Sequence, residues 1–155
     1  MTFRLIDPAE GECDDSVVPS GFPCELEEGW SYLYRGMQLW SLVDPDKAEA
    51  LKRLLKDEVE QEDAEGRVVV SPALAGRIVE QLRDLDQALL RISDDNYHLR
   101  PDSVEPVLSQ ASYLVDSWTE GGRTVYTLAN TLQDVRRARH FLERAAQLGR
   151  AVAFE

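Results

Sequence analysis

Apolar residues recur at alternating spacings of three and four between positions 75 and 92, which is the period of one face of an α-helix. The residues of this stripe are Ala75, Ile78, Leu82, Leu85, Leu89 and Ile92. Ser71 is a favourable N-cap residue, and Pro72 suits the first helical position. The pattern therefore predicts a helix with a core-facing side that begins after Ser71 and reaches about Ser93.

Two other segments show the same helical period. One begins at the N-cap residue Asp44 with Pro45 behind it, and its apolar stripe consists of Ala48, Leu51, Leu55 and Val59. The other begins at Asn130 or Thr131 and ends at Gly149, because glycine commonly follows the last residue of a helix. Its inward positions are Leu132, Val135, Ala138, Leu142 and Ala145, with Phe141 and Leu148 beside them.

A fourth helical pattern begins near Asp102. Its apolar positions are Val104, Val107, Ala111, Leu114 and Trp118. Pro106 falls within the first turn, where a proline is least harmful. The pair Gly121-Gly122 is then a suitable end, so we expect this helix to run almost to residue 120.

The aromatic stretch "CELEEGWSYLYRGMQLW" (24–40) can be read in two ways. As a strand it would place Trp30, Tyr32 and Tyr34 on one face. As a helix it would align Trp30, Leu33, Met37 and Trp40, with Tyr34 beside that stripe. The spacings of three, four and three favour a helix from about residue 28 to 42, with Gly36 allowing close packing of another element.

Short runs with strand character lie between the helices. "FRLID" (3–7), "RVVV" (67–70) and "AVAF" (151–154) read as strands, and "RTVYTLA" (123–129) reads as a strand or an extended connector. Residues 8–29 are rich in Pro, Gly and acids and predict an irregular acidic segment. The sequence thus predicts one α+β domain over 1–155, predominantly helical, with four to five helices packed on a small sheet that includes the C-terminal strand.

The end of the chain resembles a known group. The positions that carry the likeness are Phe141, Ala145, Ala146, Gly149 and Ala151–Val152, within "ARHFLERAAQLGRAVAFE". In this respect the last two-thirds of the chain are similar to the YfbM-like family of uncharacterised bacterial proteins. The resemblance implies an α+β fold in which a helix runs directly into a terminal strand. It implies no catalytic residues.

Charge restricts the partners. The net charge is −12, and residues 1–66 hold 17 acids and 6 bases. Phosphate backbones and anionic membranes repel such a surface, so nucleic acid and membrane are poor partners. The acids suit either solubility alone or electrostatic steering of a basic protein partner.

The sequence also bears on location. No apolar run approaches the ~20 residues that cross a bilayer, and the N-terminal residues do not read as a signal peptide, so we expect a cytoplasmic protein. Cys13 and Cys24 can form one loop-closing bridge or remain two reduced thiols. For a cytoplasmic protein we expect free thiols.

Candidate catalytic chemistry is sparse. His98 and His140 are not at metal-ligand spacing with each other or with a cysteine. His98, near Asp94, could act as a general base, but the pattern is more typical of a loop histidine. The sequence contains no Gly-rich phosphate loop, and its serines lack a nucleophile-elbow context. We therefore expect no enzyme activity, no cofactor and no metal site.

Two surfaces are candidates for binding. Arg136, His140 and Arg144 repeat every four residues on the last helix, and they can bind an acidic ligand, pair with the acidic first half of this chain or stay solvated. The second surface combines an aromatic residue with flanking charges near the start of the 28–42 helix. Its members are Glu25, Glu27, Glu28, Tyr32 and Arg35, with Tyr32 expected on the outer side of the helix beside Arg35.

These features lead to one main functional hypothesis and two alternatives. The main one is a non-catalytic protein-binding or inhibitory protein, most specifically a small acidic immunity protein that neutralises a basic toxin, as a monomer or homodimer. The first alternative is a housekeeping domain that binds a small ligand or self-associates. The second is a hydrolase that uses acidic residues.

Overall fold

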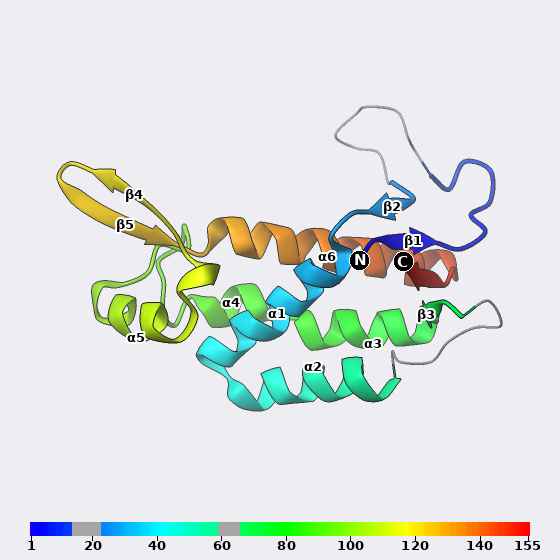
Figure 1. Ribbon diagram of the computed structural model, residues 1–155, viewed down its shortest axis with the longest axis horizontal. Helices are drawn as coiled ribbons and strands as arrows, with labels where there is room; N and C mark the ends of the chain where they lie inside the picture. Colours follow the sequence, from blue (N-terminus) through cyan, green and yellow to red (C-terminus); the bar gives the residue numbers. More distant parts are fainter. Residues whose placement is uncertain (14–22, 59–65) are drawn as a thin grey trace.

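The computed structural model describes residues 1–13, 23–58 and 66–155. The helices form the middle of an elongated molecule, with a small sheet at one end and a two-stranded hairpin at the other (Figure 1). The helices are α1 (Gly29–Val43), α2 (Pro45–Glu58), α3 (Pro72–Leu82), α4 (Leu85–Leu89), α5 (Pro101–Ala111), a 3-10 turn η1 (Ser112–Leu114) and α6 (Ala129–Leu148). The strands are β1 (Phe3–Leu5), β2 (Glu25–Leu26), β3 (Val68–Val70), β4 (Asp116–Glu120), β5 (Arg123–Thr127) and β6 (Val152–Phe154). The predicted α+β class, with helices on a small sheet that includes the C-terminal strand, is confirmed.

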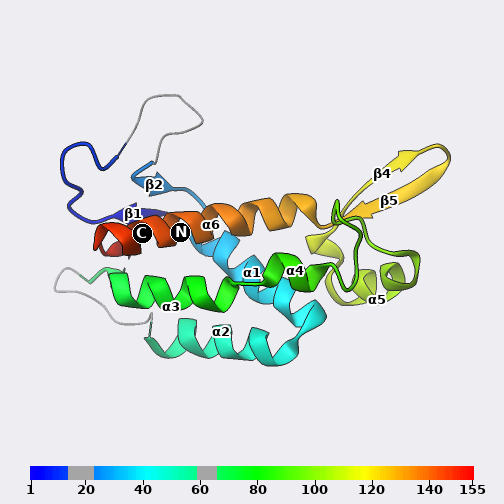
Figure 2. The same ribbon diagram turned by 180° about the vertical axis from the view of Figure 1, so that it is seen from behind.

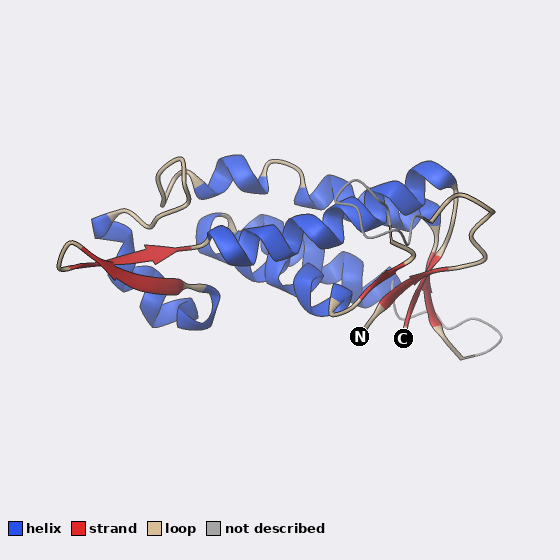
Figure 3. Cartoon of the chain, turned by 90° about the horizontal axis from the view of Figure 1, so that it is seen from above, coloured by secondary structure: helices blue, strands red, loops and turns tan. Residues whose placement is uncertain are grey.

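The four-stranded sheet joins the two ends of the chain. Its strand order is β2-β1-β6-β3, and every pairing in it is antiparallel. Phe3 lies opposite Phe154 in the register, and the backbones of Thr2 and Glu155 exchange hydrogen bonds of 2.7 and 2.9 Å. All three residues of β6 are buried, as expected for a central strand between two neighbours. The termini therefore lie side by side at this end of the molecule (Figure 3).

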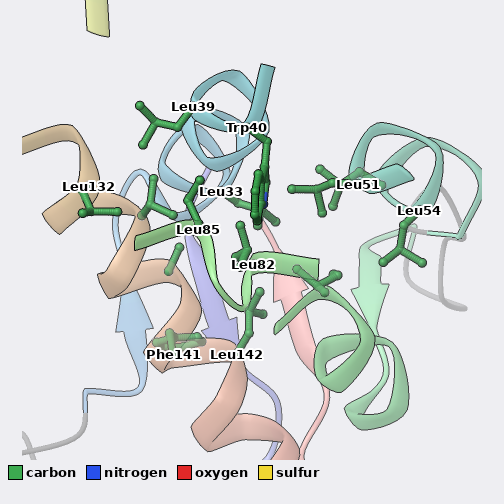
Figure 4. Packing of buried hydrophobic residues seen from close by; sticks show 14 of the residues in the cluster. Leu33, Leu39, Trp40, Leu51, Leu54, Leu82, Leu85, Leu132, Phe141 and Leu142 are labelled. Carbon is green, nitrogen blue, oxygen red and sulfur yellow. The ribbon is translucent and has the colours of Figure 1, made fainter. Parts of the chain in front are cut away.

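Helix α6 is the central helix of the bundle. It packs mainly on α1 and α3, and its predicted inward positions are buried. Figure 4 shows labelled core side chains of α1, α2, α3, α4 and α6 gathered around Leu33, Trp40 and Leu82. Gly149 ends α6 in the left-handed conformation, with φ 66°. Glycine adopts this conformation without a steric penalty, which explains the sharp turn into β6.

Helices α1 and α2 pack against each other around Trp40. The indole of Trp40 is 1% exposed, and its Nε1 donates a hydrogen bond to the carbonyl of Gln81 at 2.9 Å. The ammonium group of Lys47, in the first turn of α2, lies 4.7 Å from the Trp40 ring centroid. Gly36 of α1 faces Leu82, where a Cβ atom would come within 2.7 Å of Leu82 Cδ2. The predicted close packing at Gly36 is thus confirmed.

The helix predicted from 72 to 93 is interrupted. Ser71 caps α3 as expected, and its hydroxyl accepts a hydrogen bond from the Leu74 amide at 3.1 Å. Arg83 is extended and Asp84 is left-handed, with φ 68°, so the chain changes direction before α4. The break lets α3 pack on α6 while α4 packs on α1. Leu85 remains buried, so the stripe was predicted correctly and the continuity was not.

The helix predicted from 102 to about 120 is wrong in its second half. Helix α5 ends at Ala111, and residues 116–127 form the β4–β5 hairpin, which projects from the bundle (Figure 2). Gly121 and Gly122 are its two turn residues, with φ of 58° and 75°. A two-residue turn with positive φ at both positions matches the right-handed twist of a hairpin, and glycine is well suited to it. Trp118 consequently lies on a strand and is 41% exposed.

The acidic segment predicted over 8–29 is only partly irregular. Glu25 and Leu26 form the edge strand β2, and residues 14–22 lie outside the described part of the chain, as does Val59. Cys13 and Cys24 form a disulfide with their Cα atoms 5.4 Å apart, so the expectation of two free thiols is wrong. Within the described residues, no helix combines the length and apolar character needed to span a membrane.

Candidate functional site

The three predicted interface acids lie just before α1, but their surroundings differ. Glu25 pairs with Arg4 at 3.1 Å, and Arg4 also pairs with Glu155 at 3.0 Å. Glu27 and Glu28 are exposed, and Glu28 is left-handed with φ 59° where the chain turns into the helix. Neither Glu27 nor Glu28 takes part in an ion pair within residues 1–13, 23–58 and 66–155. Of the three acids, Glu27 and Glu28 are therefore the two that remain available to a partner.

Tyr32 and Arg35 lie on the side of α1 from which Arg35 reaches α6, and the Arg35 side chain remains 40% exposed. Tyr32 is half-buried and packs against the hydrophobic core. The guanidinium of Arg35 lies 5.5 Å from the Tyr32 ring centroid, and its Nη1 donates to Asp134 Oδ2 of α6 at 2.7 Å. This ion pair fixes Arg35 over the ring. The predicted outward position of Tyr32 is thus only partly met, because its ring is half-buried against the core with Arg35 beside it.

Two exposed tyrosines, Tyr34 of α1 and Tyr113 of η1, lie near each other on a neighbouring side of the helix. Tyr34 is 40% exposed, and its ring centroid is 6.2 Å from that of the half-buried Trp30. Tyr113 of η1 is 69% exposed, and its hydroxyl accepts a hydrogen bond from Gln38 Nε2 at 3.1 Å. We call Trp30, Tyr34 and Tyr113 the α1 aromatic face. They border a shallow hollow of about 360 Å³ that Ser31, Arg35 and Gln38 complete.

Sequence reasoning missed Tyr34 and Tyr113 as surface residues. Tyr34 was expected beside the buried stripe, and Tyr113 had no assigned role in the helix predicted there. The α1 pattern did contain a signal for Tyr34, since it lies four residues after Trp30 and so shares its side of the helix. Nothing in the sequence indicated that Tyr113 would approach Gln38, because the two residues are 75 positions apart.

A second hollow, which we call the apolar pocket, lies between α1, α2 and the sheet. Its volume is about 290 Å³, and Trp30 and Tyr34 border it as well as the first hollow. Leu55 and Phe154 are each 4% exposed, and the Trp30 and Phe154 ring centroids are 5.2 Å apart. The remaining lining residues are Met1, Met37, Lys52, Lys56 and Val68. Side chains from the N-terminus, α1, α2, β3 and β6 thus build one apolar concavity with two lysines at its border.

His98 occupies a structural position in the loop before α5. Its Nδ1 lies 3.6 Å from Asp94 Oδ2, and its ring meets the Trp118 ring edge-on at a centroid distance of 5.3 Å. The His98 backbone pairs with Thr127 at the base of the hairpin. These contacts anchor the hairpin to the loop. Across residues 1–13, 23–58 and 66–155, no group of three His, Cys, Asp or Glu side chains is arranged to hold a metal ion.

One ion pair shifts the pKa of both its members. Arg150 donates to both carboxylate oxygens of Glu12, at 2.8 and 3.0 Å. These hydrogen bonds, with a further one from the Ala9 amide, lower the pKa of Glu12. The same pairing raises the pKa of Arg150. The pair holds the segment before Cys13 against the turn that follows α6, so its role is structural.

The basic side of α6 is largely paired with acids of this chain. Arg136 and Arg139 both contact Asp86, at 2.7 and 3.4 Å, and Arg137 contacts Asp134 at 3.8 Å. This arrangement favours pairing within the chain over capture of an acidic ligand. The acidic partners belong to α4 and α6, whereas the sequence had suggested the acidic first half.

On the described surface, the two hollows are suited to aromatic and apolar contact, and charged side chains lie at their borders. Trp30 and Tyr34 are central, because they contribute to both hollows. Comparisons of the chain with protein-family models, with curated proteins and with solved structures found no match.

Proposed function

We propose that this protein is a non-catalytic binding protein that contacts a protein partner through the α1 aromatic face. The observation that carries the proposal is the grouping of Tyr34, Tyr113 and Trp30 around one hollow, with Arg35 at its edge. Tyr, Trp and Arg are the residues most enriched among those that dominate binding energy at protein interfaces. The rigid, amphipathic side chains of Tyr and Trp lose little conformational entropy when a partner covers them.

The proposed partner is a basic protein. Glu27 and Glu28 precede the helical turn that carries Trp30, and both carboxylates are exposed. Residues 1–66 hold 17 acids against 6 bases. Such a field accelerates the encounter with a positively charged protein and repels nucleic acid and anionic membranes.

The most specific form of this proposal is an immunity protein that neutralises a basic toxin. Exposed acids beside an aromatic anchor can occupy a basic active site in place of the phosphates that such a site binds. A gene for a secreted toxin beside the gene for this protein would support this form. The apolar pocket favours a second candidate function, which is the binding of a small ligand.

The proposed location is the cytoplasm, and the Cys13–Cys24 disulfide weighs against it. Disulfides persist in oxidising compartments and are rare in the cytosol, where thiols are kept reduced. Alkylation of thiols at the moment of cell lysis separates the two possibilities. Two alkylated cysteines support the cytoplasm, whereas a protected pair indicates an oxidising compartment.

The binding proposal is tested by capturing the partner with the full chain and measuring association and dissociation at two salt concentrations. Rim charges act mainly on association, and buried anchors act on dissociation. Glu27→Lys with Glu28→Lys should therefore slow association at low salt and flatten its salt dependence. Glu25 is left unchanged because its substitution would also break the ion pair with Arg4.

Tyr113→Ala should instead speed dissociation by about tenfold, since loss of a desolvated aromatic contact costs about 1–2 kcal/mol. The matched controls lie on the hairpin, whose residues do not border the hollow between Trp30, Tyr34 and Tyr113. Glu120→Lys reverses a charge there, and Trp118→Ala removes an exposed aromatic ring. The proposal is wrong if the α1 variants bind with unchanged rates, or if the hairpin controls have the larger effects.

A further inference from the structure

We infer that the apolar pocket is a binding site for a small amphipathic anion, a ligand with an apolar body and one carboxylate or phosphate group. The body of such a ligand would contact a surface that is mostly carbon. Leu55 and Phe154 form its buried part, and the rings of Trp30 and Tyr34 form one wall. Contact with these side chains removes apolar area of the ligand from water, which is the main source of affinity in pockets of this kind.

The anionic group is specified by two lysines. Lys52, Leu55 and Lys56 are three and four residues apart, so they lie on the same side of α2. Leu55 is buried while both lysines are exposed at the border of the pocket. Among the residues that the structure describes, neither lysine forms an ion pair with a carboxylate. An ammonium group is a compact point charge that binds a carboxylate or a phosphate, and two of them one turn apart can share one such group.

Two neighbouring lysines are unusual for this chain. The protein carries a net charge of −12 and has only three lysines, of which these are two. The third, Lys47, lies over the Trp40 ring elsewhere on α2. An apolar cavity bordered by the two remaining lysines therefore favours an anion in a molecule whose overall field repels one. The ligand must be small, because about 290 Å³ lies at the lower end of the range of ligand pockets.

The inference does not depend on the proposed protein partner. Lys52, Leu55 and Lys56 border the apolar pocket and do not border the hollow that contains Tyr113 and Arg35. Variants of the two lysines therefore test the ligand site, and Tyr113→Ala tests the partner surface. Each proposal can fail while the other holds.

The experiment titrates the full chain calorimetrically with octanoate, octyl phosphate, 1-octanol, octylamine and acetate. Octanoate or octyl phosphate should bind about tenfold more tightly than octanol. The reason is that two ionic contacts, partly screened by solvent, together contribute about 1–2 kcal/mol. Comparison of the two anions shows whether the site prefers a carboxylate or a phosphate. Octylamine and acetate should not bind detectably, because one has the wrong charge and the other has no apolar body. In the NMR spectrum the indole N–H of Trp30 should shift on addition of the anion.

Substitution of both lysines separates recognition of the ligand's charge from apolar contact with its body. Lys52→Gln with Lys56→Gln should lower the affinity for the anions by about tenfold and leave octanol unchanged. Arg53→Gln is the matched control, because it removes one positive charge from the same helix at a side chain that is 74% exposed and does not line the pocket. Equal binding of octanoate and octanol, anion binding that survives the double substitution, or no binding of either anion would each overturn the inference. A dimer in sedimentation that also fails to bind octanoate would show that a second copy covers the pocket instead.

Discussion

Gly29, the first residue of α1, lies against the ring of Phe3 so closely that a Cβ atom at this position would come within 2.5 Å of the ring carbon Cγ. Phe3 is fully buried and stacks on Phe154 with ring centroids 4.6 Å apart. The ring is also 6.0 Å from that of Phe141. Because buried rings surround it, Phe3 has little room to move away. This contact sets how closely the start of α1 approaches the sheet.

Gly29→Ala should therefore destabilise the protein by about 1–3 kcal/mol, the usual cost of forcing extra volume into a packed core. The matched control is Gly76→Ala in α3, where a Cβ atom would meet nothing within 4 Å. Alanine is the better helix former by about 1 kcal/mol, so this variant should be slightly more stable. Urea unfolding midpoints measure both effects. A Gly29→Ala variant as stable as wild type would show that the Phe3 ring can shift.

Leu85→Ala should cost about 2–5 kcal/mol, as expected for truncation of a large side chain in a core. Leu85 is the first residue of α4 and is only 1% exposed. Gln87→Ala changes an exposed residue of the same short helix and should alter stability by less than about 0.5 kcal/mol. Chemical unfolding of the two variants distinguishes them. Similar midpoints would mean that α4 does not contribute to the core.

Glu12→Gln should lower the thermal midpoint at neutral pH and have a smaller effect in acid. The folded protein holds the pKa of Glu12 below its ordinary value of 4.5, chiefly through the hydrogen bonds from Arg150. A carboxylate with a lowered folded pKa stabilises the protein above its unfolded pKa, and this stabilisation is lost as the pH falls through the folded pKa. Melting curves from pH 7 to below pH 4.5 should therefore show the wild-type advantage shrinking.

Glu10→Gln serves as the control for that experiment, because it removes the same charge from an exposed residue two positions earlier. Its midpoint should follow wild type throughout. An advantage of wild type over Glu12→Gln that persists undiminished in strong acid would show that the ionised pair with Arg150 is not its source.

Reduction should destabilise the protein. The Cys13–Cys24 bridge restricts the unfolded chain, and a loop of this size contributes about 2–4 kcal/mol. A reductant should lower the midpoint of wild type, whereas the Cys13→Ser and Cys24→Ser double variant should be less stable from the outset and insensitive to reductant. Mass spectrometry after alkylation should show no modified cysteine until the protein is reduced. Two modified cysteines without reductant would restore the original expectation of free thiols.

The sequence predicted most helix starts and the strand character of β1, β3 and β6, because those features depend on local chemistry. Ser71 and Gly149 act at helix ends through their own backbone and side chain. The break at Arg83 and Asp84 left no such signal, since Leu82 and Leu85 keep a helical spacing across it. Trp118 likewise continues a helical period from Leu114 although it lies on a strand. At that point the Gly121-Gly122 pair was the useful signal, because it forms a hairpin turn rather than a helix end.

The candidate surface was harder to predict than the fold. Helix α1 was placed almost to the residue, yet Tyr32, expected on the outer side, is half-buried, and Tyr34, expected beside the buried stripe, is exposed. Which side of a helix is covered depends on its neighbours, and here the ion pair between Arg35 and Asp134 joins α1 to a helix 99 positions later in the sequence. The apolar pocket combines residues of α1, α2 and β6 for the same reason. Such groupings depend on tertiary packing, which periodicity within one segment does not reveal.

The position of β6 between β1 and β3 has a consequence for synthesis of the chain. β1 and β3 do not pair with each other, and each reaches the other only through β6. On the ribosome, β6 emerges after every other element described, so the sheet cannot close while the helices are being made. Until then Phe3 and Val70, which are both fully buried in the folded protein, lack the strand beside them. Until β6 is in place, β1 and β3 therefore each present an unpaired strand edge, and such edges favour aggregation.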